Sequence, residues 1–147
     1  MANVFHLTIR HRASGRTLVN DLSFSVQPGD RIAIIGEEGN GKSTLLQYLF
    51  DPALVAPYAE AHGTSELGAL RPAFLYQELP EAALRQSVYD YLVQAGAFSV
   101  STDAELLRMA ARLALAPERI YDAQRVGTLS GGEKVKLQLL RVLATRP

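Results

Sequence analysis

The sequence contains no cysteine among its 147 residues, which excludes a disulfide framework and a zinc site built from thiolates. It also has no excess of either charge. Fifteen basic and 15 acidic side chains give a net charge of zero, so no overall attraction toward nucleic acid or an anionic membrane is evident. No apolar run approaches the roughly 18 residues of a membrane span, and no secretory signal pattern begins the chain. We therefore expect a cytoplasmic protein with no direct membrane span.

A glycine-rich stretch lies between an apolar run and a helical pattern. It consists of Gly36, Glu37, Glu38, Gly39, Asn40, Gly41, Lys42, Ser43 and Thr44. The spacing G-x-x-x-x-G-K-S is that of the phosphate-binding P-loop, or Walker A motif. Glycines let the backbone N–H groups point at phosphate oxygens, and the following helix adds its positive dipole end. We predict that this stretch binds a nucleotide, that Lys42 reaches its β- and γ-phosphates, and that Ser43 is a ligand of Mg²⁺.

Strand patterns occupy the first half of the chain. Alternating or continuous apolar residues predict strands near residues 5–9, 22–26, 32–35 and 73–76. The run at 32–35 leads into the P-loop and is expected to be buried on both faces. Between 53 and 72 we expect loops with one short strand.

After about residue 80 the pattern becomes helical. Ser87 and Thr102 have the positions of helix N-caps, Pro117 suits the first turn of a short helix, and Ser130 with Glu133 forms a capping box. These signals predict helices over 88–95, 103–115, a few residues from 117, and 131–144. The change of pattern suggests a subdomain boundary near residue 80.

Three motifs follow one another in a fixed order: the P-loop, an apolar segment ending at Gln77, and Leu-Ser-Gly-Gly-Glu at residues 129–133. In this order they resemble the ATP-binding cassette (ABC) ATPases over essentially the whole chain. The resemblance implies an α/β fold, a P-loop NTPase core of the ABC type with an α-helical subdomain. Its parts would be a strand-rich nucleotide-binding core (1–80), the α-helical subdomain (81–128), and the signature loop with its helix (129–147).

The resemblance also implies residue roles, with ATP and Mg²⁺ as the bound groups. Gln77 would help to hold Mg²⁺ and sense the γ-phosphate. Ser130, Gly131 and Gly132 would contact the γ-phosphate of ATP held by a second cassette, on the same chain or another protomer. Lys42, Gln77 and Ser130 would then take part in catalysis. Read alone, Ser130 is an ordinary N-cap and Gln77 a solvated glutamine at a strand end; only the motif order makes them sites.

Two details narrow the resemblance. Glu133 follows the signature glycines, and the span from Lys42 to Gln77 is short, as in subfamily F, whose members carry two cassettes, lack a membrane domain and act on ribosomes. This predicts a ribosome-associated ATPase. The alternative is the nucleotide-binding subunit of a membrane transporter, with membrane domains as partners. A degenerate cassette kept only for assembly is disfavoured by the intact Lys42, Ser43 and Ser130.

The sequence departs from the family pattern at two points. The loop after the first strand has no aromatic residue to stack on adenine; Ile9, His11 or Arg12 could cover the base instead. After Pro147 the family continues into the Walker B strand, with a Mg²⁺-binding aspartate and a catalytic glutamate. The resemblance therefore implies an incomplete domain whose sheet has an exposed edge. We expect this chain to bind ATP without hydrolysing it, and the parent protein to hydrolyse it.

Overall fold

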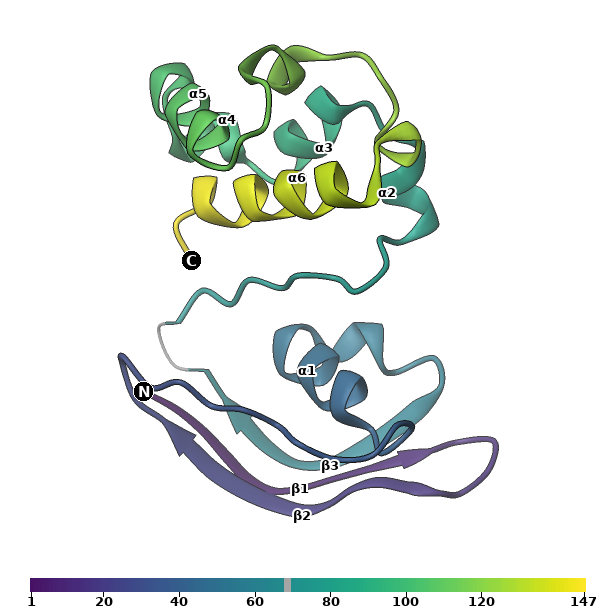
Figure 1. The fold of residues 1–147 in the computed structure, drawn as a ribbon. Coiled ribbons are helices and arrows are strands. Elements are labelled where there is room, and N and C mark those ends of the chain that lie inside the picture. The colour runs from purple at the N-terminus through teal and green to yellow at the C-terminus, as the bar shows by residue number, and fades with distance from the viewer. Residues whose placement is uncertain (68–69) are drawn as a thin grey trace. The chain divides into compact units, whose positions relative to one another are not determined.

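The computed structural model describes residues 1–67 and 70–147, and these residues form two compact units that divide after Pro72. Unit 1 is a sheet with one helix packed on it, and unit 2 is helical (Figure 1). The described residues include no helix that is both long and apolar enough to cross a membrane.

Within the described part of unit 1, three antiparallel strands form a sheet of order β2-β1-β3. The strands are β1 (Ala2–His11), β2 (Thr17–Val26) and β3 (Ala59–Glu66). β3 is the short strand predicted between 53 and 72, and β1 and β2 extend the strands predicted near 5–9 and 22–26. Central β1 is the most protected, because it pairs with β2 on one side and β3 on the other.

A bulge changes which side chains of β1 face the core. The pairing of β1 with both neighbours shifts between residues 4 and 8, where His6 has a φ of 50°. Val4, Leu7 and Ile9 are buried as a result, whereas Phe5, which simple alternation places with Leu7, is 47% exposed. Gly63 of β3 lies against the bulge, and a Cβ there would come within 2.5 Å of the His6 carbonyl oxygen.

Helix α1 (Lys42–Phe50) covers one face of this sheet (Figure 1). Its Leu45 packs into a core with Leu7, Ile9 and Val55. The helix ends at Asp51, whose carboxylate accepts from the Ala53 N–H at 3.0 Å and so caps the short 3₁₀ helix η1 (Pro52–Leu54). The start of α1 at Lys42 fixes where the glycine-rich loop ends.

The strands predicted at 32–35 and 73–76 are not formed. Neither segment is part of a strand in the described structure, and Ile35 is 93% exposed. An apolar run becomes a strand only when its N–H and C=O groups pair with a neighbour, and composition does not supply that neighbour. The prediction that 32–35 is buried on both faces is therefore wrong, and the run leaves an apolar edge exposed.

Unit 2 consists of short helices around a longer one. They are α2 (Glu81–Arg85), α3 (Val88–Gln94), α4 (Ala97–Val100), α5 (Asp103–Arg112), the 3₁₀ helices η2 (Pro117–Tyr121) and η3 (Val126–Thr128), and α6 (Gly131–Ala144). The predicted N-caps Ser87, Thr102 and Ser130 all cap helices, each accepting the N–H three residues on. α5 ends at 112 instead of 115, and α2 and α4 were not predicted.

The core of unit 2 lies between α6 and the shorter helices. Leu137 and Leu140 of α6 pack there with Leu92, Leu106 and Ile120. Residues 73–80 belong to this unit by their packing, although the sequence pattern groups them with the strand-rich part. Leu79 is buried in the unit 2 core, and Tyr76 packs against it.

Candidate nucleotide-binding site

The loop at residues 36–41 curls tightly before α1. Gly39 and Gly41 have φ angles of 76° and 75°, a left-handed conformation that side chains with a Cβ rarely adopt. Gly41 also lies against the start of β2: a Cβ there would be 2.7 Å from the Leu18 carbonyl oxygen. Conformation and space both require glycine at position 41, so its place in the motif has a physical cause in this fold.

Helix α1 begins at Lys42 with an uncapped end. Its N-cap is Gly41, which has no side chain to accept the N–H groups of the first turn. Ser43 is exposed in that turn. The backbone donors of the first turn and the positive end of the helix dipole suit an anion such as a phosphate group.

Lys42 points back over the loop. Its Nζ donates to the Gly36 carbonyl oxygen at 2.8 Å and to the Glu37 carbonyl oxygen at 2.5 Å. An ammonium group has three donors and no acceptor, and it is as well suited to phosphate oxygens as to these carbonyls. The side chain is thus held over the first residues of the loop by two backbone carbonyl oxygens. A positive charge lies where the motif requires one.

The loop is supported by the β1–β2 hairpin. Arg16 Nη2 donates to Asn40 Oδ1 at 3.1 Å, which ties the tip of the hairpin to the loop. A cavity of about 240 Å³ opens beside the loop, lined by Leu18, Ile35, Gly36, Asn40 and Lys42 among others. Sequence reasoning missed Arg16, because its partner lies 24 residues away and no local pattern marks the pair.

The expected base-covering residues are engaged in other contacts. Ile9 is fully buried in the unit 1 core, so the suggestion that it covers adenine is wrong. His11 Nδ1 contacts the Ser14 hydroxyl at 3.1 Å, and Arg12 Nε donates to the Ala56 carbonyl oxygen at 3.2 Å.

Unit 1 also has an apolar hollow of about 480 Å³ between the face of β2, residues 32–34 and α1. Phe24, Ile32 and Leu46 are among its lining residues, and Ile32 and Leu46 are 56% and 45% exposed.

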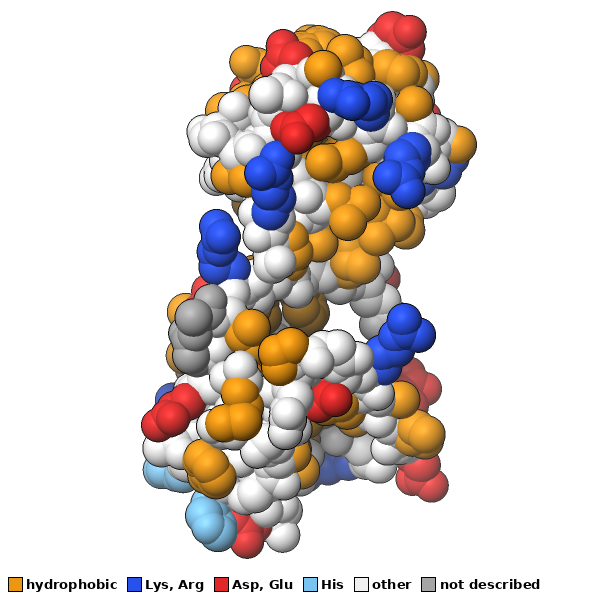
Figure 2. Space-filling view, turned by 90° about the vertical axis from the view of Figure 1, so that its left-hand side faces the viewer, with side chains coloured by type: hydrophobic (Ala, Val, Ile, Leu, Met, Phe, Trp, Pro, Cys, Tyr) orange, Lys and Arg blue, Asp and Glu red, His pale blue; other side chains and the backbone are white. Residues whose placement is uncertain are grey.

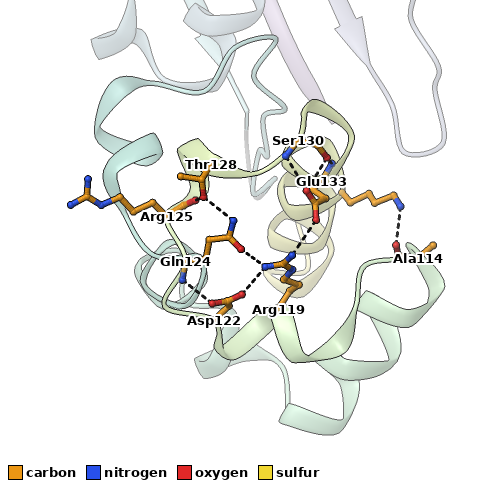
Figure 3. A network of polar contacts seen from close by, with 9 residues as sticks. Ala114, Arg119, Asp122, Gln124, Arg125, Thr128, Ser130 and Glu133 are labelled. Atoms are coloured by element: carbon orange, nitrogen blue, oxygen red, sulfur yellow. Dashed lines mark hydrogen bonds and ion pairs between the residues drawn. The ribbon is translucent and has the colours of Figure 1, made fainter.

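In unit 2, Ser130 is the N-cap of α6 and forms a complete capping box with Glu133 (Figure 3). The Ser130 hydroxyl donates to Glu133 Oε2 at 2.8 Å and accepts from the Glu133 N–H at 3.3 Å, while the Ser130 N–H donates to the same carboxylate at 2.9 Å. Gly131 and Gly132 lie exposed in the first turn. The ordinary role of Ser130 as a cap is therefore present in the structure.

A polar network holds the other side of Glu133 (Figure 3). Arg119 Nη2 lies 3.7 Å from Glu133 Oε1, and Arg119 Nη1 donates to Asp122 Oδ2 at 2.8 Å and to Gln124. Bonds from the Ser130 N–H and hydroxyl, followed by weaker attraction to Arg119, hold the pKa of Glu133 below its usual value. Glu133 is thus a carboxylate fixed beside the signature turn, and sequence reasoning missed Arg119 as its neighbour.

Gln77 is exposed, and its support comes from α6. The side-chain amide of buried Gln138 bonds both the N–H and the carbonyl oxygen of Tyr76, the residue before Gln77. This contact, between residues 62 positions apart, was also not predicted.

The predicted site residues are divided between the units. Residues 36–44 belong to unit 1, whereas Gln77 and Ser130–Gly132 belong to unit 2. Among the described residues no group of three or more His, Asp or Glu could hold a metal ion. The donor set nevertheless fits Mg²⁺, which binds oxygen ligands and commonly takes one or two from protein and the rest from phosphates and water. The Ser43 hydroxyl in unit 1 and the Gln77 side-chain amide in unit 2 each contain an oxygen atom of this kind, and their roles as Mg²⁺ ligands stay predictions.

Comparison with known proteins identifies a family and several proteins to which this chain is similar. A family model described as ABC transporter matches residues 19–147. The hemin import ATP-binding protein HmuV of Burkholderia mallei is 36% identical over 98% of this chain and 59% of its own length. The lipoprotein-releasing system ATP-binding protein LolD of Coxiella burnetii is 34% identical over 88% of this chain and 61% of its own. The chain spans 59–61% of the length of these relatives.

Proposed function

The chain belongs to the ABC transporter family of ATPases, and from this premise we propose that it binds Mg-ATP through residues 36–44 as part of the ATP-binding subunit of a membrane transporter. The observation that carries the proposal is the combination at the P-loop. Gly41 opens an uncapped helix, and Lys42 Nζ is held over the loop. This combination offers backbone donors, a helix dipole and the ammonium group of Lys42 to one anion.

The residues would share the work as follows. Backbone N–H groups of the loop and of the first turn of α1 bind the phosphates, and Lys42 neutralises charge on the β- and γ-phosphates. Ser43 holds Mg²⁺, with Gln77 as a further oxygen ligand; the ion supplies charge neutralisation at the phosphates. Ser130, Gly131 and Gly132 act on ATP bound by a second cassette. Hydrolysis is proposed for the whole protein, and binding for this chain.

A role in a membrane transporter replaces membership of subfamily F as the main proposal. The subfamily F hypothesis rests on Glu133 and on the short span from Lys42 to Gln77. In contrast, two relatives that are similar to most of this chain are named for hemin import and lipoprotein release. Figure 2 shows acidic as well as basic side chains on the drawn face of the described residues, in keeping with a net charge of zero. Membrane domains and a second cassette are the proposed partners, and the cytoplasm the proposed location.

Calorimetric titration with Mg-ATP tests the nucleotide site. Lys42→Met should weaken binding about ten- to a hundredfold, because it removes a charged hydrogen bond to phosphate. Lys136→Met is the matched control: its Nζ also donates to a backbone carbonyl oxygen, that of Ala114 at 2.8 Å, but in unit 2. Equal effects of the two substitutions, or no binding by the unsubstituted chain, would refute the proposal.

A second experiment separates the two cellular roles. The intact parent protein, purified from detergent-solubilised membranes, should copurify with a protein that has transmembrane helices. ATP-dependent co-sedimentation with ribosomes, without such a partner, would instead support subfamily F and overturn the transporter proposal.

A further inference from the structure

Gln138 lies about two turns into α6, and its side chain is only 5% exposed. The side-chain amide makes both bonds that a neighbouring strand would make to one residue. Oε1 accepts from the Tyr76 N–H at 2.8 Å, and Nε2 donates to the Tyr76 carbonyl oxygen at 3.2 Å. It thus supplies to Tyr76 the two bonds that a strand partner would supply.

Tyr76 is also anchored by its ring, and the chain is anchored again just beyond it. The Tyr76 side chain packs against the unit 2 core, and Leu79 is buried in the same core. Gln77 lies between these two anchors and is exposed. A backbone fixed on both sides of an exposed polar side chain is the arrangement expected of a residue presented to a ligand.

We propose that Gln138 is a positioning residue for Gln77, and that it joins Gln77 to the helix that Ser130 opens. Because α6 is a continuous hydrogen-bonded element, one helix then carries the signature turn at its start and the support of Gln77 two turns later. A movement of the signature turn with α6 would carry the backbone at Tyr76 with it. This inference rests on the proposed function, since it requires that Gln77 contacts the nucleotide or its metal ion.

A purely structural role for Gln138 is the competing explanation, and the chain offers a matched control. Ser101 is also buried, at 4% exposure, and its hydroxyl donates to the Ala144 carbonyl oxygen at 2.8 Å. Like the contact of Gln138 with Tyr76, this bond joins α6 to another segment of unit 2 through a buried polar side chain, but at the C-terminal end of the helix. Ser101→Ala therefore removes a comparable bond without touching the segment before Gln77.

Amide hydrogen exchange without nucleotide tests the contact itself. Gln138→Met conserves volume but removes both bonds, so the Tyr76 N–H should exchange about tenfold faster. Gln138→Glu should give an intermediate rate, because a carboxylate still accepts from the Tyr76 N–H but has no donor for its carbonyl oxygen. Ser101→Ala should leave Tyr76 unchanged. Unchanged exchange at Tyr76 in Gln138→Met would overturn the proposal.

Mg-ATP titration of the same chain then tests the role. Gln77→Ala and Gln138→Met should weaken binding by the same factor, and the double variant by no more than either, because one residue acts through the other. Ser101→Ala should bind as the unsubstituted chain does. Additive losses, an equal loss in Ser101→Ala, or no loss in Gln77→Ala would overturn the proposal. If the unsubstituted chain fails to bind Mg-ATP, the proposed function fails instead, and the exchange result still decides whether Gln138 holds Tyr76.

Discussion

Three glycines of the P-loop differ in what a methyl group would meet, and this difference allows a quantitative test of the site. At Gly36 an added Cβ would lie 3.9 Å from Lys42 Cδ, an ordinary contact. At Gly39 it would meet only Arg16 Nη1 at 4.0 Å, but the φ of 76° is unfavourable. At Gly41 the φ is almost the same, 75°, and the Cβ would also lie 2.7 Å from the Leu18 carbonyl oxygen.

These contacts predict a graded loss of stability on substitution by alanine. Gly36→Ala should change the free energy of unfolding by less than about 0.5 kcal/mol. Gly39→Ala should cost about 1–2 kcal/mol, the penalty of a left-handed conformation for a residue with a Cβ. Gly41→Ala should cost about 2–5 kcal/mol, because overpacking against a backbone atom of β2 adds roughly 1–3 kcal/mol to the same penalty.

Urea unfolding followed by methyl NMR measures the loss of stability separately in unit 1 and in unit 2. Signals of Leu7 and Val55 report on the unit 1 core, and the signal of Ile120 reports on unit 2. Only the unit 1 midpoint should move, with an unchanged dependence on urea concentration. If Gly39→Ala and Gly41→Ala cost the same within about 0.5 kcal/mol, the contact with Leu18 does not constrain the loop and the reasoning is refuted.

Two further predictions concern acid and the apolar edge, beside those already given for Lys42 and Gln138. Ser130→Ala should raise the pKa of Glu133, measured by carboxyl NMR titration, because the Ser130 hydroxyl helps to hold that pKa below its usual value. Because folding lowers the pKa of Glu133, its carboxylate stabilises unit 2 at pH values above the usual pKa of a glutamate, and this stabilisation is lost as the pH falls through the lowered pKa. A pKa of Glu133 that Ser130→Ala leaves unchanged would contradict the assignment. Ile35→Asp should leave unit 1 stability within about 0.5 kcal/mol but reduce self-association in light scattering, because Ile35 is 93% exposed. Leu7→Ala, at a fully buried position, is the contrast and should cost about 2–5 kcal/mol; similar losses at the two positions would show that residues 32–35 are not an exposed edge.

The subfamily hypothesis shows where motif spacing stops being informative. Glu133 and the short span to Gln77 pointed to subfamily F, but similarity over most of the chain led to ATP-binding proteins named for hemin import and lipoprotein release. In the structure Glu133 has a local structural role, because its carboxylate completes the capping box at the start of α6. A residue whose side chain completes a helix cap has a structural reason to be there, so it gives little information about the cellular partner.

The sequence by itself determined the features whose interactions are local. The P-loop, the start of α1 at Lys42 and the caps Ser87, Thr102 and Ser130 each depend on residues within a few positions, so their pattern is visible in the chain. The family also followed from the order of such motifs. Local order therefore sufficed to locate the candidate site.

Only the tertiary structure decided the features that depend on distant partners. Residues 32–35 and 73–76 have the composition of strands, but a strand requires a neighbour that composition cannot reveal. The bulge at His6, which turns Phe5 outward, depends on register with β2 and β3. The contacts of Arg16 with Asn40 and of Gln138 with Tyr76 join residues 24 and 62 positions apart, and folding alone brings such side chains within hydrogen-bonding distance.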